Sequence, residues 1–122
     1  MLVIADSSAL VALATCDVLD ILPQIFDEIR VPEAVYREVV VDGKPLADEL
    51  KEFLASRVTA VTLQSMVVNV GGLGAGELEA MALYKSLTAD YLLIDDRRAR
   101  RIAEANGIEC IGSLWVLLEA KR

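Results

Sequence analysis

The chain contains no histidine and only two cysteines in 122 residues. Without histidine it cannot build a Ser-His-Asp or Cys-His nucleophile. Cys16 and Cys110 lie far apart and match no zinc-binding spacing, so we expect both to serve as small buried hydrophobic residues. Any chemistry must therefore rest on carboxylates, hydroxyls, lysine, arginine or a bound metal ion.

Long apolar runs are missing as well. Hydrophobic residues make up 55% of the chain and the mean hydropathy is +0.46, yet no apolar run approaches the ~20 residues of a membrane span. The apolar segment at the start, Met1–Ile4, is too short for the apolar region of a secretory signal, because the charged Asp6 follows closely. We expect a cytoplasmic protein with no membrane partner, whose apolar excess forms the core and leaves some surface for a homodimer.

Positive charge is scarce: the chain has 12 lysines and arginines but 19 aspartates and glutamates, which gives a net charge of −7. Domains that bind nucleic acid usually carry a basic face, so this total argues mildly against one. The total also hides local detail. If several acids gather around a metal ion, the rest of the surface is close to balanced and a phosphate substrate remains compatible with it.

The stretch YLLIDDRRARR, residues 91–101, carries the clearest pattern. The apolar run Tyr91–Ile94 predicts a buried strand, and the helical pattern over 97–106 begins directly after Asp95 and Asp96. Two carboxylates therefore follow the carboxyl end of a strand. In open α/β sheets, ligands bind at this edge.

The start of the chain repeats this order. Leu2–Ala5 predicts a strand that ends at Asp6, and we expect Ser8 to cap the helix that follows. If both strands are parallel members of one sheet, Asp6 and the pair at 95 and 96 lie at the same edge. The sequence thus predicts a site made from the two strand ends.

The remaining pattern alternates helices and strands, which predicts a single α/β domain over residues 1–122, with a mostly parallel sheet and helices on both faces. Residues Arg30-Val31 look too short for more than a fragment of strand. We expect Leu114, Trp115, Leu117 and Leu118 to form the buried face of the last helix. Further helices are predicted over 17–29 (divided near Pro23), 32–40, 46–55, 75–87 and 113–120, and further strands over 57–63, 66–70 and 108–111.

Two glutamates fall among apolar residues on the predicted helices. On a helical wheel, Glu38 lies between Ala34 and Val35, and Glu77 lies on the inward side of its helix. Glu79 falls on the opposite side. The glycines before this helix, residues 71–76, lack the Gly-Lys-Ser/Thr ending of a phosphate-binding loop, so we expect a flexible loop and a helix start there.

Five carboxylates are therefore candidate catalytic residues. Each has an ordinary explanation alone, as a helix cap or a partner of an arginine, but a buried unpaired carboxylate costs several kcal/mol by order of magnitude. A cluster without histidine is the oxygen-only donor set that Mg²⁺ or Mn²⁺ requires. The candidates are Asp6, Glu38, Glu77, Asp95 and Asp96. Asp95 and Asp96 cannot both face this site if the strand stays extended through them.

Four arginines at 97, 98, 100 and 101 occupy the start of the helix that follows, where the helix dipole disfavours cations. Neighbouring acids, an anionic substrate or simple solvation would offset this cost. Arg97 and Arg101 share one face. We take these two and Ser8 as candidate substrate contacts, with a solvated basic face as the alternative for the arginines.

Four motifs together resemble a PIN domain, and are especially similar to the compact prokaryotic PIN proteins related to VapC toxins and to the DUF3368 group. The resemblance covers essentially the whole chain. It implies a three-layer α/β/α fold and a Mg²⁺- or Mn²⁺-dependent endoribonuclease that uses metal-activated water, often paired with a small antitoxin protein and commonly dimeric. The motifs are IADSS, PEAVYREVV, GLGAGELEAMAL and LLIDDRRARR.

Carried over by position, the resemblance implies that Asp6, Glu77 and Asp96 bind the metal, with Asp95 as the alternative to Asp96. In the mechanism that such a metal site supports, Glu38 or Asp95 would orient the attacking water. The chain departs from the family pattern twice. Glu77 stands where the toxin families usually have aspartate, and Ile94-Asp95 replaces the usual Thr-Asn/Arg.

Two other functions remain open. The first is a PIN-like binding or oligomerisation module with weak catalysis or none. The second is a receiver-like phosphoacceptor, but there the acidic pair resembles the end of the first strand and a lysine follows the last strand. Here the pair comes late, and Cys110-Ile111-Gly112 offers no lysine.

Overall fold

The computed structural model describes residues 1–61 and 72–122, which form an α/β fold in three layers. The elements in chain order are β1 (Leu2–Ala5), α1 (Ser7–Thr15), a 3-10 turn (Leu19–Ile21), α2 (Leu22–Ile25), β2 (Glu28–Pro32), α3 (Glu33–Val39), α4 (Ala47–Leu54), β3 (Val58–Thr59), α5 (Ala75–Leu87), β4 (Tyr91–Leu93), α6 (Arg97–Ala105), β5 (Cys110–Ile111) and α7 (Ser113–Ala120).

The described strands form one parallel sheet in the order β3-β2-β1-β4-β5. The strand β1 is central, and its Ile4 pairs with Arg30 of β2 on one side and with Leu92 of β4 on the other. Ile4 and Leu92 are fully buried, as expected for a parallel sheet that is covered on both faces. The expected three-layer α/β/α fold with a parallel sheet is confirmed.

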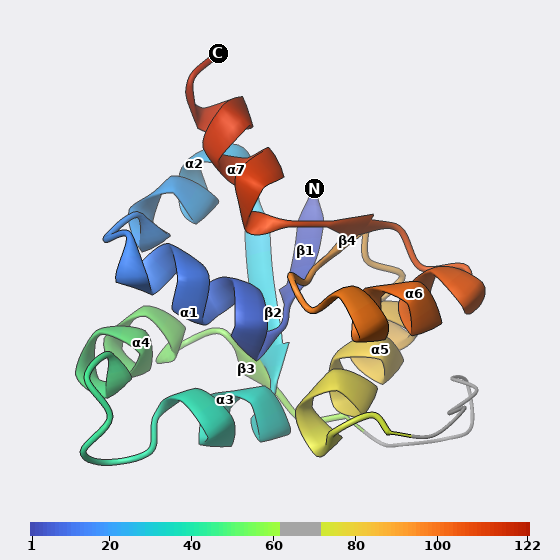
Figure 1. The fold of residues 1–122 in the computed structure, drawn as a ribbon, viewed down its shortest axis with the longest axis horizontal. Helices are drawn as coiled ribbons and strands as arrows, with labels where there is room; N and C mark the ends of the chain where they lie inside the picture. Colours follow the sequence, from blue (N-terminus) through green and yellow to red (C-terminus); the bar gives the residue numbers. More distant parts are fainter. Residues whose placement is uncertain (62–71) are drawn as a thin grey trace.

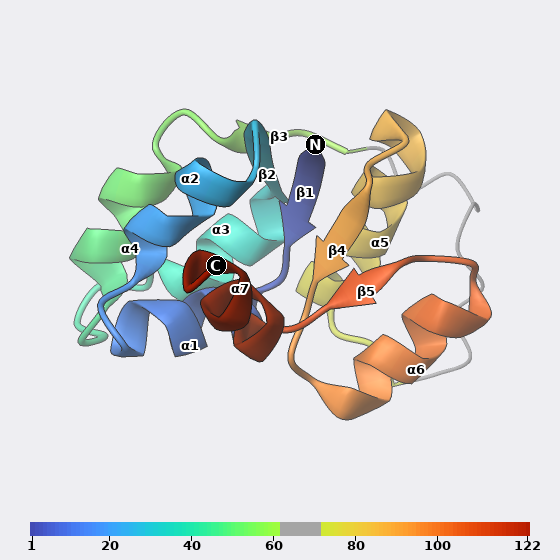
Figure 2. The same cartoon turned by 90° about the horizontal axis from the view of Figure 1, so that it is seen from above.

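Helices cover the sheet and share one hydrophobic core with it. Helix α5 packs against β1, β2 and β4, whereas α1 and α2 both contact α7 (Figures 1 and 2). Phe26 and Tyr91 pack against the ring of Trp115 from α7, with ring centroids 6.1 and 5.9 Å away. At the carboxyl edge of the sheet, β1 leads into α1 and β4 leads into α6.

The segment predicted as one divided helix over 17–29 is only partly helical. A 3-10 turn and α2 end at Ile25, and β2 then begins at Glu28. The prediction that Arg30-Val31 forms no more than a fragment of strand is therefore wrong, because β2 has five residues. Ile29 and Val31 are both buried; Ile29 pairs in register with Val3 of the central strand and Val31 with Val58 of β3, and this long-range pairing outweighs the helical spacing of the apolar residues up to Ile29.

The cap of α1 also differs from the prediction. Asp6 is the N-cap, with an extended backbone, and its side chain accepts a hydrogen bond from the Ser8 N–H. Ser8 lies inside the first turn. The carboxylate at the end of β1 is therefore fixed by the helix that follows it.

The last helix is less buried than predicted. Only Val116 of α7 is fully buried, Trp115 is half-buried, and Leu114 and Leu118 are 68% and 59% exposed. Because α7 is apolar on all sides, its wheel does not reveal which side faces the core.

The two cysteines are less buried than expected. Cys16 is exposed rather than buried, and Cys110 is half-buried, with burial raising the pKa of its thiol to about 11.

The strand predicted over 57–63 is described only at Val58–Thr59, and the one predicted over 66–70 lies outside the described residues. Among the described residues no single helix is long and apolar enough to cross a membrane; the bent pair Ser7–Thr15 and Leu19–Ile25 meets the length and composition criteria together.

Candidate active site

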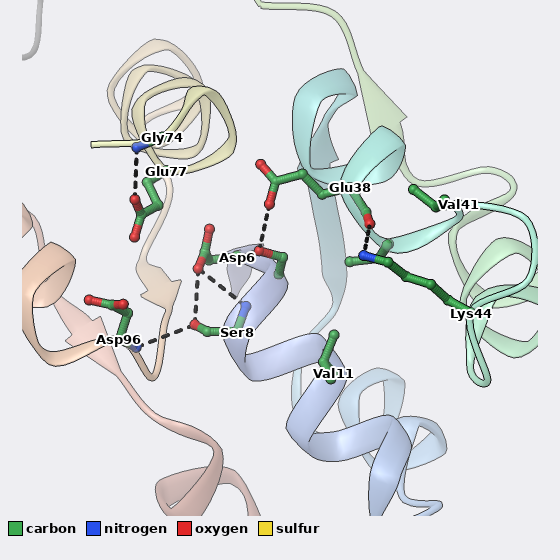
Figure 3. Close-up of a pocket in the computed structure, with 11 residues that line it drawn as sticks. Asp6, Ser8, Val11, Glu38, Val41, Lys44, Gly74, Glu77 and Asp96 are labelled. Carbon is green, nitrogen blue, oxygen red and sulfur yellow. Dashed lines mark hydrogen bonds between the residues drawn. The ribbon is translucent and has the colours of Figure 1, made fainter. Parts of the chain in front are cut away.

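A cleft of about 720 Å³ opens at the carboxyl edge of the sheet, where β1 and β4 lead into α1 and α6 (Figure 3). It brings together four of the five predicted acids: Asp6, Glu38, Glu77 and Asp96. They come from both strand ends and from α3 and α5. The other residues of the lining are Ser7, Ser8, Val11, Val39, Val41, Lys44 and Gly74.

Asp6 is the most constrained of these acids. It is only 1% exposed, and its Oδ2 accepts hydrogen bonds from the Ser8 N–H at 3.3 Å and from Ser8 Oγ at 2.9 Å. Its Oδ1 is buried and has no hydrogen-bond partner among the described residues. Burial raises the pKa of the Asp6 carboxyl, and the negative charge of Glu77 adds to the effect. A buried acceptor atom without a partner is chemically suited to a cation.

The hydroxyl of Ser8 joins the two strand ends. Ser8 Oγ donates to Asp6 and accepts from the N–H groups of Asp95 and Asp96, at 3.0 and 3.3 Å. The Ser8 hydroxyl, which is predicted to contact the substrate, thus already makes hydrogen bonds within the protein. Its contacts fix Asp6 relative to the backbone of Asp96.

Glu77 and Glu38 approach the cleft from two helices. The Gly74 N–H donates to Glu77 Oε1 at 2.9 Å, which closes the first turn of α5. Glu38 is exposed, contrary to its predicted place on a buried stripe, and its Oε2 accepts from Ser7 Oγ at 3.0 Å. A Cβ on Gly76 would overlap Glu38 Oε1, so this glycine allows Glu38 to approach α5 closely.

Asp95 and Asp96 diverge, in line with the alternation expected of an extended backbone. Asp96 caps α6 by accepting from the Ala99 N–H at 2.9 Å, and it lines the cleft. Asp95 accepts from the Ser113 N–H at 2.8 Å and from Ser113 Oγ at 2.6 Å. Asp95 therefore holds the start of α7, and it is not part of the cleft lining.

Asp6, Glu77 and Asp96 share one arrangement. Each uses one carboxylate oxygen to accept an N–H at the start of a helix, α1, α5 or α6. The other oxygen of each has no hydrogen-bond partner among the described residues. Three hard oxygen donors on one cleft fit a divalent cation such as Mg²⁺ or Mn²⁺. As they stand, however, no three acidic or cysteine side chains in the described part of the chain form a group that could hold a metal ion.

Some neighbours of the site escaped the sequence analysis. Lys44 lines the cleft from the turn before α4, and its Nζ donates to the Glu38 carbonyl at 3.4 Å. A charged residue in a turn has no sequence pattern that would predict its position in the cleft. Glu79, expected to point outward, accepts from the Ala34 N–H at 3.1 Å and anchors the start of α3. Arg97 and Arg101 are exposed on α6, outside the cleft lining.

Comparisons with known proteins agree with this geometry. No curated protein matches the chain. A PilT N-terminus domain protein from the hyperthermophilic archaeon Sulfolobus solfataricus P2 has a similar structure, with a TM-score of 0.73 and 19% identity over 98% of this chain and 93% of that one. At this identity the likeness shows the fold alone. The DUF3368 family model, described as a PIN domain, matches residues 2–122, and the chain therefore belongs to the DUF3368 family of PIN domains.

Proposed function

We propose that this protein is a ribonuclease that hydrolyses RNA phosphodiester bonds with water activated by Mg²⁺ or Mn²⁺. PIN domains are a family of nucleases, which supports the reaction class. The observation that carries the proposal is the buried Oδ1 of Asp6, which has no partner among the described residues and lies in a cleft with two further helix-capping carboxylates. Such an atom is costly to the fold unless a cation shares the space.

Asp6, Glu77 and Asp96 would hold the metal through the oxygens that helix capping leaves unused. A bound metal polarises the scissile phosphate and lowers the pKa of water. The chain itself positions the ligands. Ser8 fixes Asp6 through two hydrogen bonds, and the N–H groups of Gly74 and Ala99 fix the other two carboxylates.

Glu38 is the better candidate for orienting the attacking water. Its Oε2 receives the Ser7 hydroxyl, and the side chain lines the cleft opposite Asp96 (Figure 3). Asp95, the alternative from the sequence, has both oxygens engaged by Ser113. A carboxylate within reach of the water accepts its proton as a general base. In-line attack by water leaves a 5′-phosphate and a 3′-hydroxyl.

Cleavage of a mixed RNA panel tests this function directly. The purified protein is incubated with structured and single-stranded RNAs in Mn²⁺, in Mg²⁺ and in EDTA, beside Asp96→Asn and a control, Asp48→Asn, on the exposed side of α4. We expect metal-dependent cleavage by the native chain and the control, and none by Asp96→Asn. Full activity in Asp96→Asn would exclude the proposed metal site.

A non-catalytic PIN module is the second candidate function. It is favoured by the finding that no three acids of the described chain form a ready metal group. Titration calorimetry separates the two. Absence of Mn²⁺ binding at millimolar metal, by a folded protein, would favour the non-catalytic module; binding that disappears in Asp6→Asn would favour the nuclease.

The proposal extends to a toxin role in the cytoplasm, opposed by a small antitoxin protein, which the family resemblance supports. Expression of the native chain in a bacterial host should arrest growth, and Asp96→Asn should not. Equal growth of both strains would remove the toxin role.

We also propose a homodimer, because Leu114 and Leu118 present exposed apolar surface. Light scattering on the native chain and on Leu118→Glu measures this directly.

A further inference from the structure

Helix α6 concentrates positive charge in a chain that is acidic overall. The net charge is −7, yet four of the 12 basic residues lie within the nine residues of α6. The buried residues of this helix are small or apolar, so its basic residues are not needed to fill the core. The arginines are Arg97, Arg98, Arg100 and Arg101.

The place of these charges is unfavourable for the helix itself. Arg97 lies in the first turn, where the positive end of the helix dipole repels cations, and that turn contains no acidic residue. Arg97 and Arg101 are exposed and form no ion pair or hydrogen bond with the described residues. Exposed cations that form no ion pair with a carboxylate of the described chain are available to bind an anionic ligand.

The helix also begins at the cleft. Asp96 both lines the cleft and caps α6, so Arg97 is the first residue beyond the candidate metal site. Helix α4 lies on the opposite side of the molecule from α6 (Figures 1 and 2), and its exposed charges, Asp48, Glu49, Lys51 and Glu52, are mostly negative. The α6 side and the α4 side of the molecule therefore differ in charge. A polyanion at the cleft is attracted toward the exposed arginines of α6 and repelled by the exposed carboxylates of α4.

We propose that the phosphates of the substrate strand beside the scissile bond bind Arg97 and Arg101, so that the strand leaves the cleft along α6 rather than across α4. The two arginines lie one turn apart on one face, about 6 Å along the axis. Guanidinium groups bind phosphate oxygens with two hydrogen bonds, and such contacts position the strand without reading its sequence. This inference rests on the proposed nuclease function, but it concerns binding and can be measured without cleavage.

A binding experiment in EDTA tests it. A fluorescent, single-stranded RNA of mixed sequence is titrated with the native chain, with the double variant Arg97→Ala/Arg101→Ala, and with a control, Lys121→Ala/Arg122→Ala. The control removes the same charge from the end of the chain. We expect the α6 variant to lower the slope of log affinity against log salt by about 0.7 for each lost phosphate contact, and the control to keep the native slope. A DNA of the same sequence should behave alike, because the contacts are to phosphates.

A single charge reversal separates binding from folding. Arg97→Glu should unfold at a higher temperature than the native chain, because it places a carboxylate at the start of α6, and should bind RNA more weakly. A variant that merely damaged the fold would unfold earlier. Unchanged binding in the double variant, an equal loss in the control pair, or no binding by the native chain would each overturn the inference.

Cleavage kinetics distinguish this inference from the nuclease proposal. If the native chain cleaves RNA in Mn²⁺, Arg97→Ala/Arg101→Ala should raise KM and retain kcat. An unchanged KM would refute the path along α6 and leave the nuclease in place. If the native chain cleaves nothing but its binding in EDTA depends on the two arginines, the nuclease proposal fails and the assignment of α6 as a phosphate-binding face stands.

Discussion

Replacing Asp6 with asparagine should stabilise the metal-free protein. Asparagine keeps the oxygen that accepts from the Ser8 N–H and Oγ, and removes a charge from a site that is 1% exposed. It also removes the repulsion from Glu77. The amide Nδ2 takes the place of the unpartnered Oδ1, but burying an uncharged group costs less than burying a charge, so we expect a gain of about 1 kcal/mol in the free energy of unfolding. For a domain of this size this raises Tm by about 4 °C per kcal/mol.

The gain should depend on pH in a defined direction. Because burial raises the pKa of Asp6 above its ordinary value of 3.8, the folded state binds a proton more tightly than the unfolded state does. The contribution of Asp6 to stability therefore falls as pH rises from 3.8 through the raised value. The advantage of Asp6→Asn should be largest above this window and should disappear below it, where the native carboxyl is protonated and also neutral.

Bound metal should make the native chain more stable than Asp6→Asn, which reverses the order of stability expected without metal. A ligand that binds only the folded state stabilises it by RT ln(1 + [L]/Kd), and the native chain should gain this from Mn²⁺ while Asp6→Asn gains little. Thermal unfolding in EDTA and in Mn²⁺, at neutral and at acidic pH, measures all three effects, with Asp48→Asn as the exposed control. Lower stability of Asp6→Asn in EDTA at neutral pH would refute the assigned cost of the buried carboxylate.

Three further substitutions test the parts around Asp6. Ser8→Ala should destabilise the protein by about 1–2 kcal/mol, because it removes an acceptor that joins two strand ends, and should weaken Mn²⁺ binding in calorimetry. Gly76→Ala should displace Glu38 and slow cleavage, while circular dichroism shows an intact fold; native activity would contradict the role of Glu38. Asp95→Asn should lower the free energy of unfolding by about 1 kcal/mol through the start of α7 at Ser113 and keep most of the cleavage rate, since its oxygens lie outside the cleft lining.

Strand ends and helix starts made the position of the cleft predictable from the sequence. The run Tyr91–Ile94 and the run Leu2–Ala5 are each too apolar to lie anywhere but in the core, and each stops at a carboxylate. Once both are parallel neighbours, their acids must share an edge. The convergence of Asp6, Glu77 and Asp96 follows from chain topology together with the inward side of α5.

The sequence could not predict features that depend on partners far along the chain. Ile29 continues a helical spacing, and only its pairing with Val3 of β1 makes it a strand residue. Asp95 and Asp96 are chemically identical neighbours, and the helix start at Ser113 draws Asp95 away from the cleft. The uniform apolar character of α7 likewise hides which of its sides packs against the core.

Helix capping explains how this fold holds three acids around one cleft. An N–H group at the start of a helix stabilises a nearby carboxylate, and α1, α5 and α6 each supply one. One oxygen of each side chain is thereby fixed, and the other stays available for chemistry. Asparagine preserves the cap at Asp6 and Asp96 but weakens metal binding, whereas alanine removes both. If the caps position the ligands, the alanine variants should lose stability as well as Mn²⁺ binding, and the asparagine variants should lose only Mn²⁺ binding. Equal stability in both series would mean that the caps are incidental and that the cleft is held together by the packing of its strands alone.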